Sequence, residues 1–417
     1  MDTLQKLVDS DFTTKTGIKV KISVMPDPNK LILAASAGTT PDVSLGLGSH
    51  MPFDFAIREA AYDLTEFDDF WTYAERFAPG TLVPYIFDDG VYAIPESLNF
   101  NALVYRKDIF ETLDIMVPET WQEVVQILPE LQRYGMNFYL PISDGLSGLK
   151  WFYQTSPFIY MMDGELYNEN GTSVAIDSAN SVKGLDFLIS MFTKYSLPKQ
   201  VMVFSNSFRY GSLPIGIVDF NQYLQIKNVA PELVGQWEIT SIPGMAQENG
   251  DISRWYIANG TNGMILNNSD KKDESWEFLK WWQDTEVQTT YSYNLQSTFG
   301  EEFVWLSGNT EALANAPIDN SDKQVILESI DWIRDVPRTP GQYMLERGLS
   351  DIWYKGVFDD YSTRFIVDVQ TLTINREIER KMIEFGFIDE DGNQLKEFVI
   401  RDLDWVLEQI ELAKGGE

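Results

Sequence analysis

Three pairs of adjacent acidic residues are the first candidates for chemistry: Asp68-Asp69, Glu301-Glu302 and Asp359-Asp360. Two carboxyl groups can hydrolyse a glycosidic bond when they flank it on opposite sides, about 5 to 10 Å apart. Adjacent side chains of a strand or helix point in different directions and seldom face one another across a substrate. The spacing therefore predicts solvated surface charge at all three pairs.

Other reactive groups are scarce. Cysteine is absent and His50 is the single histidine, which excludes thiolate nucleophiles, disulfides and His/Cys zinc sites. The loop Asp389-Glu-Asp-Gly-Asn393 is similar to a calcium loop, but its glycine comes two positions early and no glutamate follows at the twelfth position. Phosphate-binding loops and nucleophile elbows are also missing. We expect no metal, no cofactor and no catalysis.

Composition limits the partners. With 417 residues, 44% of them hydrophobic and 13% aromatic, the chain can bury large cores and should form two domains or one two-lobed unit. Lysine and arginine number 32 against 63 acidic residues, so the formal net charge is −31. Nucleic acid is a poor partner, because its affinity for proteins comes largely from cationic side chains. No apolar run approaches the roughly 18 residues of a membrane span.

The elements that would position binding side chains alternate between strands and helices, which predicts an α/β fold with mainly parallel sheets. A strand is expected at Ile18–Val24, a helix at Asn29–Ala37, and a short strand after Asp42 that leaves through the glycine-rich loop Gly46–His50. Loops at the carboxyl ends of parallel strands commonly line ligand sites. A plain turn explains the glycines of this loop equally well.

Helix starts and apolar stripes place the remaining elements. Helices should begin at Lys107, after Thr120, where Glu123 completes a capping box, and after Ser178. Apolar periodicity predicts four helices near the C-terminus, at Val325–Asp335, Leu349–Phe358, Thr373–Phe385 and Phe398–Leu412.

The stretch Tyr92–Phe110, with the strand Ala102-Leu-Val-Tyr105 inside it, resembles a segment of family 1 of the bacterial extracellular solute-binding proteins. In that maltose-binding-protein-like family, which serves ABC importers, this segment crosses from one lobe to the other. Gly211–Tyr223 and Glu238–Gly244 resemble later segments of the family in the same order. Two residues depart from the pattern: Arg106 replaces a polar residue, and Glu96 replaces an apolar one.

The resemblance implies an α/β, periplasmic-binding-protein-like fold of type II, with two α/β lobes joined by a multi-segment hinge and a ligand cleft between them. The first lobe would comprise residues 1–101 and 260–325 and would lack the family's first strand; the second would comprise residues 102–259 and 326–417. Such a protein captures a mono- or oligosaccharide by hinge closure and delivers it to the transmembrane subunits of an ABC permease. A monomer without cofactors suffices for this activity.

The matching positions of the family imply a set of ligand-contacting residues. Aromatic rings stack on the C–H face of a pyranose, while Asp, Asn, Gln and Arg bond its hydroxyls. The candidates are Gly48, Ser49, His50, Asn99, Trp151, Phe152, Gln154, Asp219, Asn221, Tyr223, Trp255, Arg338 and Tyr343. Burial in a core is the competing interpretation for each ring, and we adopt it for Trp121, Trp276 and Trp282, which stand on helices with apolar periodicity.

Two other functions stay open at this point. The acidic chain and the unusual Gly46–His50 loop would also suit a peptide, a polyamine or another small polar solute. A carbohydrate-active enzyme would need two separated carboxyl groups, for which Asp219 and Glu96 are the candidates.

The resemblance also implies an extracytoplasmic location, at the cell surface or in the periplasm. Leu4, Leu7, Val8 and Phe12 predict that the chain opens with an amphipathic helix, and no export signal precedes it. We expect a lipoprotein-like membrane anchor on an N-terminal segment outside this chain; a cytoplasmic protein is the alternative. The segment after Gly386 extends past the usual end of the family and has no assigned role.

Overall fold

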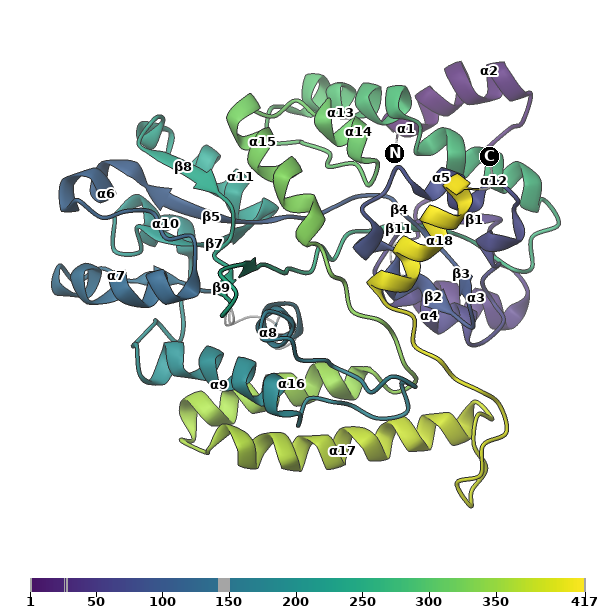
Figure 1. Cartoon of the computed structure of the whole chain (residues 1–417). Helices are drawn as coiled ribbons and strands as arrows, with labels where there is room; N and C mark the ends of the chain where they lie inside the picture. Colours follow the sequence, from purple (N-terminus) through teal and green to yellow (C-terminus); the bar gives the residue numbers. More distant parts are fainter. Residues whose placement is uncertain (1, 26, 28, 142–150, 416–417) are drawn as a thin grey trace. The chain divides into compact units, whose positions relative to one another are not determined.

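The computed structural model describes residues 2–25, 27, 29–141 and 151–415. The chain divides into two compact units (Figure 1). The first unit contains Met1–Asn99, Ala258–Arg338 and Arg401–Glu417, and the second contains Phe100–Ile257 and Thr339–Ile400. The chain therefore passes between the units four times, and each passage is called a crossing below.

The first two crossings fall two residues before the positions expected from the sequence, whereas the C-terminal part differs more. Residues 326–338 and 401–417 lie in the first unit, although the sequence suggested the second. Residues 401–417 belong to the first unit because α18 (Leu403–Gly415) packs against the core of that unit. Its Val406 and Ile410 are buried in the core of the first unit, and the Trp405 ring lies 5.5 Å from the Trp71 ring.

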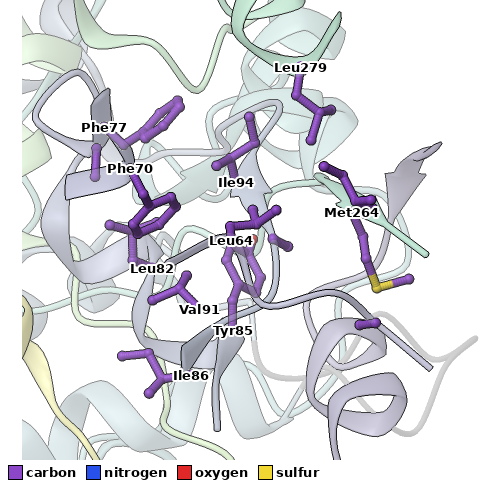
Figure 2. Packing of buried hydrophobic residues seen from close by; sticks show 14 of the residues in the cluster. Leu64, Phe70, Phe77, Leu82, Tyr85, Ile86, Val91, Ile94, Met264 and Leu279 are labelled. Carbon is purple, nitrogen blue, oxygen red and sulfur yellow. The ribbon is translucent and has the colours of Figure 1, made fainter. Parts of the chain in front are cut away.

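A sheet with the strand order β1-β11-β4 lies at the centre of the first unit. The strands are β1 (Val43–Leu47), β11 (Asn262–Ile265) and β4 (Ile94–Pro95), and both pairings are antiparallel. Figure 2 shows the apolar side chains that pack beside these strands. The helices of this core include α4 (Met51–Ala56), α5 (Phe70–Ala74) and α12 (Lys272–Trp282).

The N-terminal segment is helical, as predicted. It runs through α1 (Asp2–Leu7), a π-helical turn (Val8–Phe12) and α2 (Thr13–Thr16), and ends at Gly17, whose φ is 76°. Val8 and Phe12 are fully buried against Phe278 of α12.

The strand expected at Ile18–Val24 is not formed. The side chain of Gln5 bonds this segment instead: its Nε2 donates to the carbonyl of Val20 at 3.1 Å, and its Oε1 accepts from the backbone N–H of Ile22 at 3.1 Å. The backbone of this segment is thus bonded to a side chain where a strand would bond a neighbouring strand. The helix expected next is present as α3 (Asn29–Ala37).

The second unit contains a sheet with the strand order β6-β7-β5-β8. Its strands are β6 (Phe138–Tyr139), β7 (Ile215–Asp219), β5 (Asn101–Arg106) and β8 (Trp237–Thr240). The β6–β7 pair is parallel, and β5 is antiparallel to both β7 and β8. The expectation of mainly parallel sheets is therefore wrong for both units.

The direction of the crossings explains the antiparallel pairing of β4 and β11 in the first unit. The chain leaves the first unit after β4 and returns to it just before β11, so these two strands lie side by side and run in opposite directions. In the second unit, β5, β7 and β8 lie within one stretch of the chain, so no crossing accounts for their antiparallel pairing.

Helices of the second unit begin where the sequence predicts. Helix α6 spans Lys107–Leu113, and α7 (Trp121–Arg133) starts with the predicted capping box of Thr120 and Glu123. Ser178 caps α9 (Ala179–Thr193). Figure 1 shows α8 (Trp151–Tyr160), α9, α16 (Tyr343–Phe358) and α17 (Thr363–Glu384) packed together in this unit.

Helices near the C-terminus occur in the predicted regions with shifted ends. Both α16 and α17 begin earlier than expected. The helix expected over residues 325–335 is α15 (Asn320–Ser329) followed by a short 3₁₀ turn (Ile330–Trp332). Within the described part of the chain, no helix combines the length and the apolar character needed to cross a membrane.

The acidic motifs lie on the surface. All six carboxylates of the adjacent acidic pairs are exposed, which confirms the interpretation as surface charge. Asp389 lies in a solvated turn and accepts the backbone N–H groups of Asp391 and Asn393 through one carboxylate oxygen, at 3.0 and 2.8 Å. Trp121, Trp276 and Trp282 are buried, as predicted.

Candidate functional site

The loop after β1 is the candidate binding segment of the first unit. The pairing register of β1 with β11 shifts between Ser44 and Leu47, and Gly46 has a φ of 72°. A side chain is strained in this conformation, so glycine fits the position. After the shift, Gly48 and His50 are exposed, whereas Ser49 is buried.

A buried glutamate bonds this loop from within the first unit. Glu96 is 5% exposed; its Oε2 accepts the backbone N–H of Gly46 at 2.6 Å and the hydroxyl of Thr261 at 3.3 Å. Its Oε1 accepts the indole N–H of Trp282 at 3.1 Å. Burial raises the pKa of Glu96 to about 7, although all three of these hydrogen bonds favour the ionised form.

Arg338 bonds the same loop. Its Nη2 donates to Ser49 Oγ at 2.9 Å, and Ser49 Oγ donates to Asn259 Oδ1 at 3.4 Å. The guanidinium is buried, with 4% of the residue exposed. Arg338 therefore holds the side chain of Ser49 by a hydrogen bond and exposes little surface that a solute could contact.

A second buried carboxylate lies three residues before Arg338. Asp335 Oδ1 accepts the backbone N–H of Ala258 at 2.7 Å, the first residue after the second crossing. Burial raises the pKa of Asp335 to about 7, opposed by this bond and by the charge of Arg338. Asp335 thus connects the two ends of the stretch Ala258–Arg338, which lies between the second and third crossings.

In the second unit, three candidates lie where β7 runs directly into α11 (Phe220–Val229): Asp219 ends the strand, and Asn221 and Tyr223 lie on the helix. Asp219 caps α11: its Oδ1 accepts the backbone N–H of Gln222 at 2.9 Å. Asn221 is exposed. Tyr223 is 1% exposed, with the ring of Phe100 at 5.8 Å and that of Trp237 at 5.9 Å, so it belongs to the core of this unit.

The other candidates lie on separate segments of the chain. Gln154 is half-buried on α8; Trp151 and Phe152 open this helix, but their side chains lie outside the described part. Trp255 is half-buried just before the second crossing.

Asn99 is half-buried and is the last residue before the first crossing. Tyr343 is half-exposed at the start of α16, where its hydroxyl donates to Glu377 of α17. Across residues 2–415, as far as they are described, no group of three or more His, Cys, Asp or Glu side chains could hold a metal ion.

Comparison with known proteins decides the family. Residues 1–289 match the family described as bacterial extracellular solute-binding protein. The chain belongs to this family. The expected family resemblance is thereby confirmed, and membership places the solute-binding protein outside the cytoplasm.

Relatives of the solute-binding protein support the assignment. It is 25% identical over 345 residues to a protein of Brucella abortus (strain 2308) whose name places it among binding proteins, with 78% of this chain and 77% of the relative covered. Among solved structures, the sugar-binding protein MalE of Xanthomonas citri gives a TM-score of 0.77 at 20% identity, covering 92% of this chain and 96% of MalE. An extracellular solute-binding protein of Staphylococcus aureus, solved with maltose, gives 0.74 at 18% identity, covering 91% and 95%. These similarities confirm the expected α/β, type II periplasmic-binding-protein-like fold.

The structure brings some of the expected residues of the solute-binding protein together. Ser49 and Arg338 are in direct contact within the first unit, and both serve to hold the loop. Gly48 and His50 remain exposed beside them. Tyr223 is removed from the candidate set by its burial in the second unit.

Sequence reasoning missed the loop contacts of two residues of the first unit, Asn262 and Glu96. Asn262 of β11 is fully buried, and its Nδ2 donates to the carbonyls of Leu47 at 2.9 Å and Gly48 at 3.1 Å. Glu96 was recognised as a departure from the family pattern and as half of a possible acid pair, but its contact with Gly46 lies 50 residues away along the chain. No local pattern signals either contact.

Proposed function

We propose that this solute-binding protein captures a mono- or oligosaccharide outside the cytoplasm and delivers it to the transmembrane subunits of an ABC permease. The match of residues 1–289 to the family carries this proposal. The preference for a carbohydrate is supported by a relative in Streptococcus mutans named a multiple sugar-binding protein, 27% identical over 135 residues, which cover 32% of this chain and 31% of the relative. The structural likeness to MalE supports the same preference.

Candidates from both units would contact the sugar: those that are exposed or half-exposed, and Trp151 and Phe152, whose side chains lie outside the described part. In the first unit these are Gly48, His50 and Asn99; in the second they are Trp151, Phe152, Gln154, Asn221, Trp255 and Tyr343. Hydrogen bonds from the amides would select the hydroxyl pattern, and the rings would add stacking that is less selective. A sugar that binds the closed arrangement of the two units better than the open one would drive closure.

Binding without catalysis is part of the proposal. The two carboxyl groups nominated for an enzyme have other tasks: Glu96 is buried among three hydrogen-bond donors, and Asp219 caps α11. The chain should not hydrolyse chromogenic glycosides. Turnover that is lost in Asp219→Asn would favour the enzyme instead.

Calorimetric titration of the purified chain tests the proposal. The panel contains maltose, maltotetraose and D-tagatose, with spermidine and a short peptide as the competing solute classes. A saturable signal with a sugar, accompanied by a concentration-dependent rise in melting temperature, is the expected result. Binding of spermidine or the peptide alone would replace the carbohydrate with another solute.

We also propose that an N-terminal membrane anchor keeps the protein at the cell surface. Fractionation of cells that produce the full gene product checks this. Recovery in the membrane fraction is expected, and recovery only in the soluble extracytoplasmic fraction would contradict it.

A further inference from the structure

The loop Gly46–Ser49 is held by buried polar side chains along its whole length. Glu96 accepts the N–H of Gly46, Asn262 donates to the carbonyls of Leu47 and Gly48, and Arg338 donates to the side chain of Ser49. We call Glu96, Asn262 and Arg338 the loop frame. All three are at most 5% exposed, whereas Gly48 and the adjacent His50 face solvent.

The loop frame comes from the segments that lead into or out of the crossings. Glu96 lies three residues before the end of the first segment at Asn99, and Asn262 follows the second crossing. Arg338 is the last residue before the third crossing. Three stretches that are distant in sequence therefore meet at one short loop.

Such a frame is costly for stability. Burying an ionisable carboxyl or a guanidinium removes its hydration, and an apolar side chain of similar volume often packs at lower free energy. The family pattern has an apolar residue where this chain has Glu96, so the acid has a specific effect here. Its bond to Gly46 fixes the backbone at the point where the register of β1 shifts and φ is positive.

We propose that Glu96, Asn262 and Arg338 are positioning residues that hold the Gly46–Ser49 backbone in the conformation that the captured carbohydrate contacts. This inference rests on the proposed function. Glu96 is the testable member, because its ionised form is the stronger acceptor for the three donors around it. Protonation adds a donor to one of the two oxygens, which weakens the bonds from Gly46, Thr261 and Trp282.

The charged and titratable groups near Glu96 define the controls. Its charge acts on Tyr85 and Tyr291, whose pKa values are raised by burial, so both tyrosines stay neutral near pH 7. Asp335 and Arg338 also act on Tyr85, and the pKa of Asp335 is raised to about 7 by burial. Histidine side chains ordinarily titrate in the same range, so His50 needs its own control.

The experiment measures maltose affinity by calorimetry between pH 5.5 and 8.5 for the wild type and Glu96→Gln. Burial raises the pKa of Glu96 to about 7, so wild-type affinity should fall by up to about 30-fold from pH 8.5 to 5.5 if only the ionised form holds the loop. Glu96→Gln should bind more weakly than the wild type at pH 8.5 and show a flat profile. The wild-type profile should persist in Asp335→Asn and in Glu301→Gln, which alters an exposed glutamate of the same unit. His50→Gln, at a proposed sugar contact, should lower the affinity at every pH value and keep the fall in affinity from pH 8.5 to 5.5.

A second measurement separates this inference from the proposed function. Amide hydrogen exchange over residues 45–50 is compared, as protection factors, in the sugar-free wild type and Glu96→Gln at pH 6 and 8. Protection should be lower in the variant at pH 8 and should fall in the wild type at pH 6. If maltose does not bind but protection changes as expected, the carbohydrate assignment fails and the positioning role stands.

Two results would overturn the inference. One is equal loop protection in the wild type and Glu96→Gln at both pH values. The other is maltose binding by the wild type with a pH profile that Glu96→Gln reproduces, since the carboxyl would then have no influence on the contact with the sugar.

Discussion

Replacing Asp335 with asparagine should change the pH dependence of stability in a predictable direction. Burial raises the pKa of Asp335 from its ordinary 3.8 to about 7, against the opposing effects of the Ala258 N–H and the charge of Arg338. The folded protein therefore holds this proton more tightly than the unfolded chain does. The corresponding stability is present below about pH 4 and is lost as the pH rises to about 7.

The magnitude follows from the part of the shift that lies in the accessible range. Between pH 5 and pH 8 about two pKa units are titrated, at roughly 1.4 kcal/mol each, which gives about 2 to 3 kcal/mol. The wild type loses this amount of stability between pH 5 and pH 8, and Asp335→Asn does not. The unfolding free energy of the variant minus that of the wild type should therefore be larger by this amount at pH 8 than at pH 5. Any constant effect of the altered hydrogen bonds cancels in this comparison.

Urea unfolding followed by circular dichroism at both pH values measures this difference. Asp331→Asn is the matched control, because Asp331 is exposed and lies on the preceding 3₁₀ turn. The control should shift stability by the same small amount at both pH values. A difference between Asp335→Asn and the wild type that is equal at pH 5 and pH 8 would refute the reasoning.

Three further substitutions test the packing and the caps. Ile410→Ala should lower the unfolding free energy measured in urea by about 2 to 4 kcal/mol, because this side chain is buried in the core of the first unit. Leu407→Ala, on the exposed side of α18, should lower it by about 0.5 kcal/mol or less. Equal losses in the two variants would mean that α18 does not pack on this core. Thr120→Ala should cost about 1 kcal/mol through loss of the capping box of α7, with recovery in Thr120→Ser; no change in the urea midpoint would contradict the cap. Arg106→Ala should lower the unfolding free energy, measured by thermal unfolding, by about 3 kcal/mol. The buried guanidinium donates to both carboxylate oxygens of Asp108, at 2.8 and 2.6 Å, and to the carbonyl of Phe208. An unchanged melting temperature would show that these bonds have no net effect on stability.

Local signals in the sequence predicted helix starts well. Lys107, Thr120 and Ser178 open or cap their helices as expected, because a cap is made by residues within one turn of the helix end. The buried helical tryptophans were also predictable, since apolar periodicity reports which face of a helix is covered.

Strand pairing was less predictable, because it depends on distant partners. Ile18–Val24 has the composition of a strand, yet its backbone is bonded by the side chain of Gln5. The antiparallel pairing of β4 with β11 arises from the chain leaving and re-entering the first unit. Neither arrangement has a signature in the residues of the strand itself.

The candidate site shows the same division. Exposed positions such as His50, between β1 and α4, and Asn221, in the first turn of α11, follow from their place just after a strand. Tyr223 has similar neighbours in sequence, but it lies one turn into α11 and points into the core beside Phe100. The role of Glu96 depends on a contact with Gly46 across 50 residues, which only the fold reveals.

Small-angle X-ray scattering during a titration with maltose and maltotetraose tests the central claim most directly. The claim is that a carbohydrate is bound by residues of both units and favours their closure. The account predicts a saturable decrease in the radius of gyration that follows the calorimetric binding curve. Saturable sugar binding with an unchanged radius of gyration, or no response to any sugar, would contradict it.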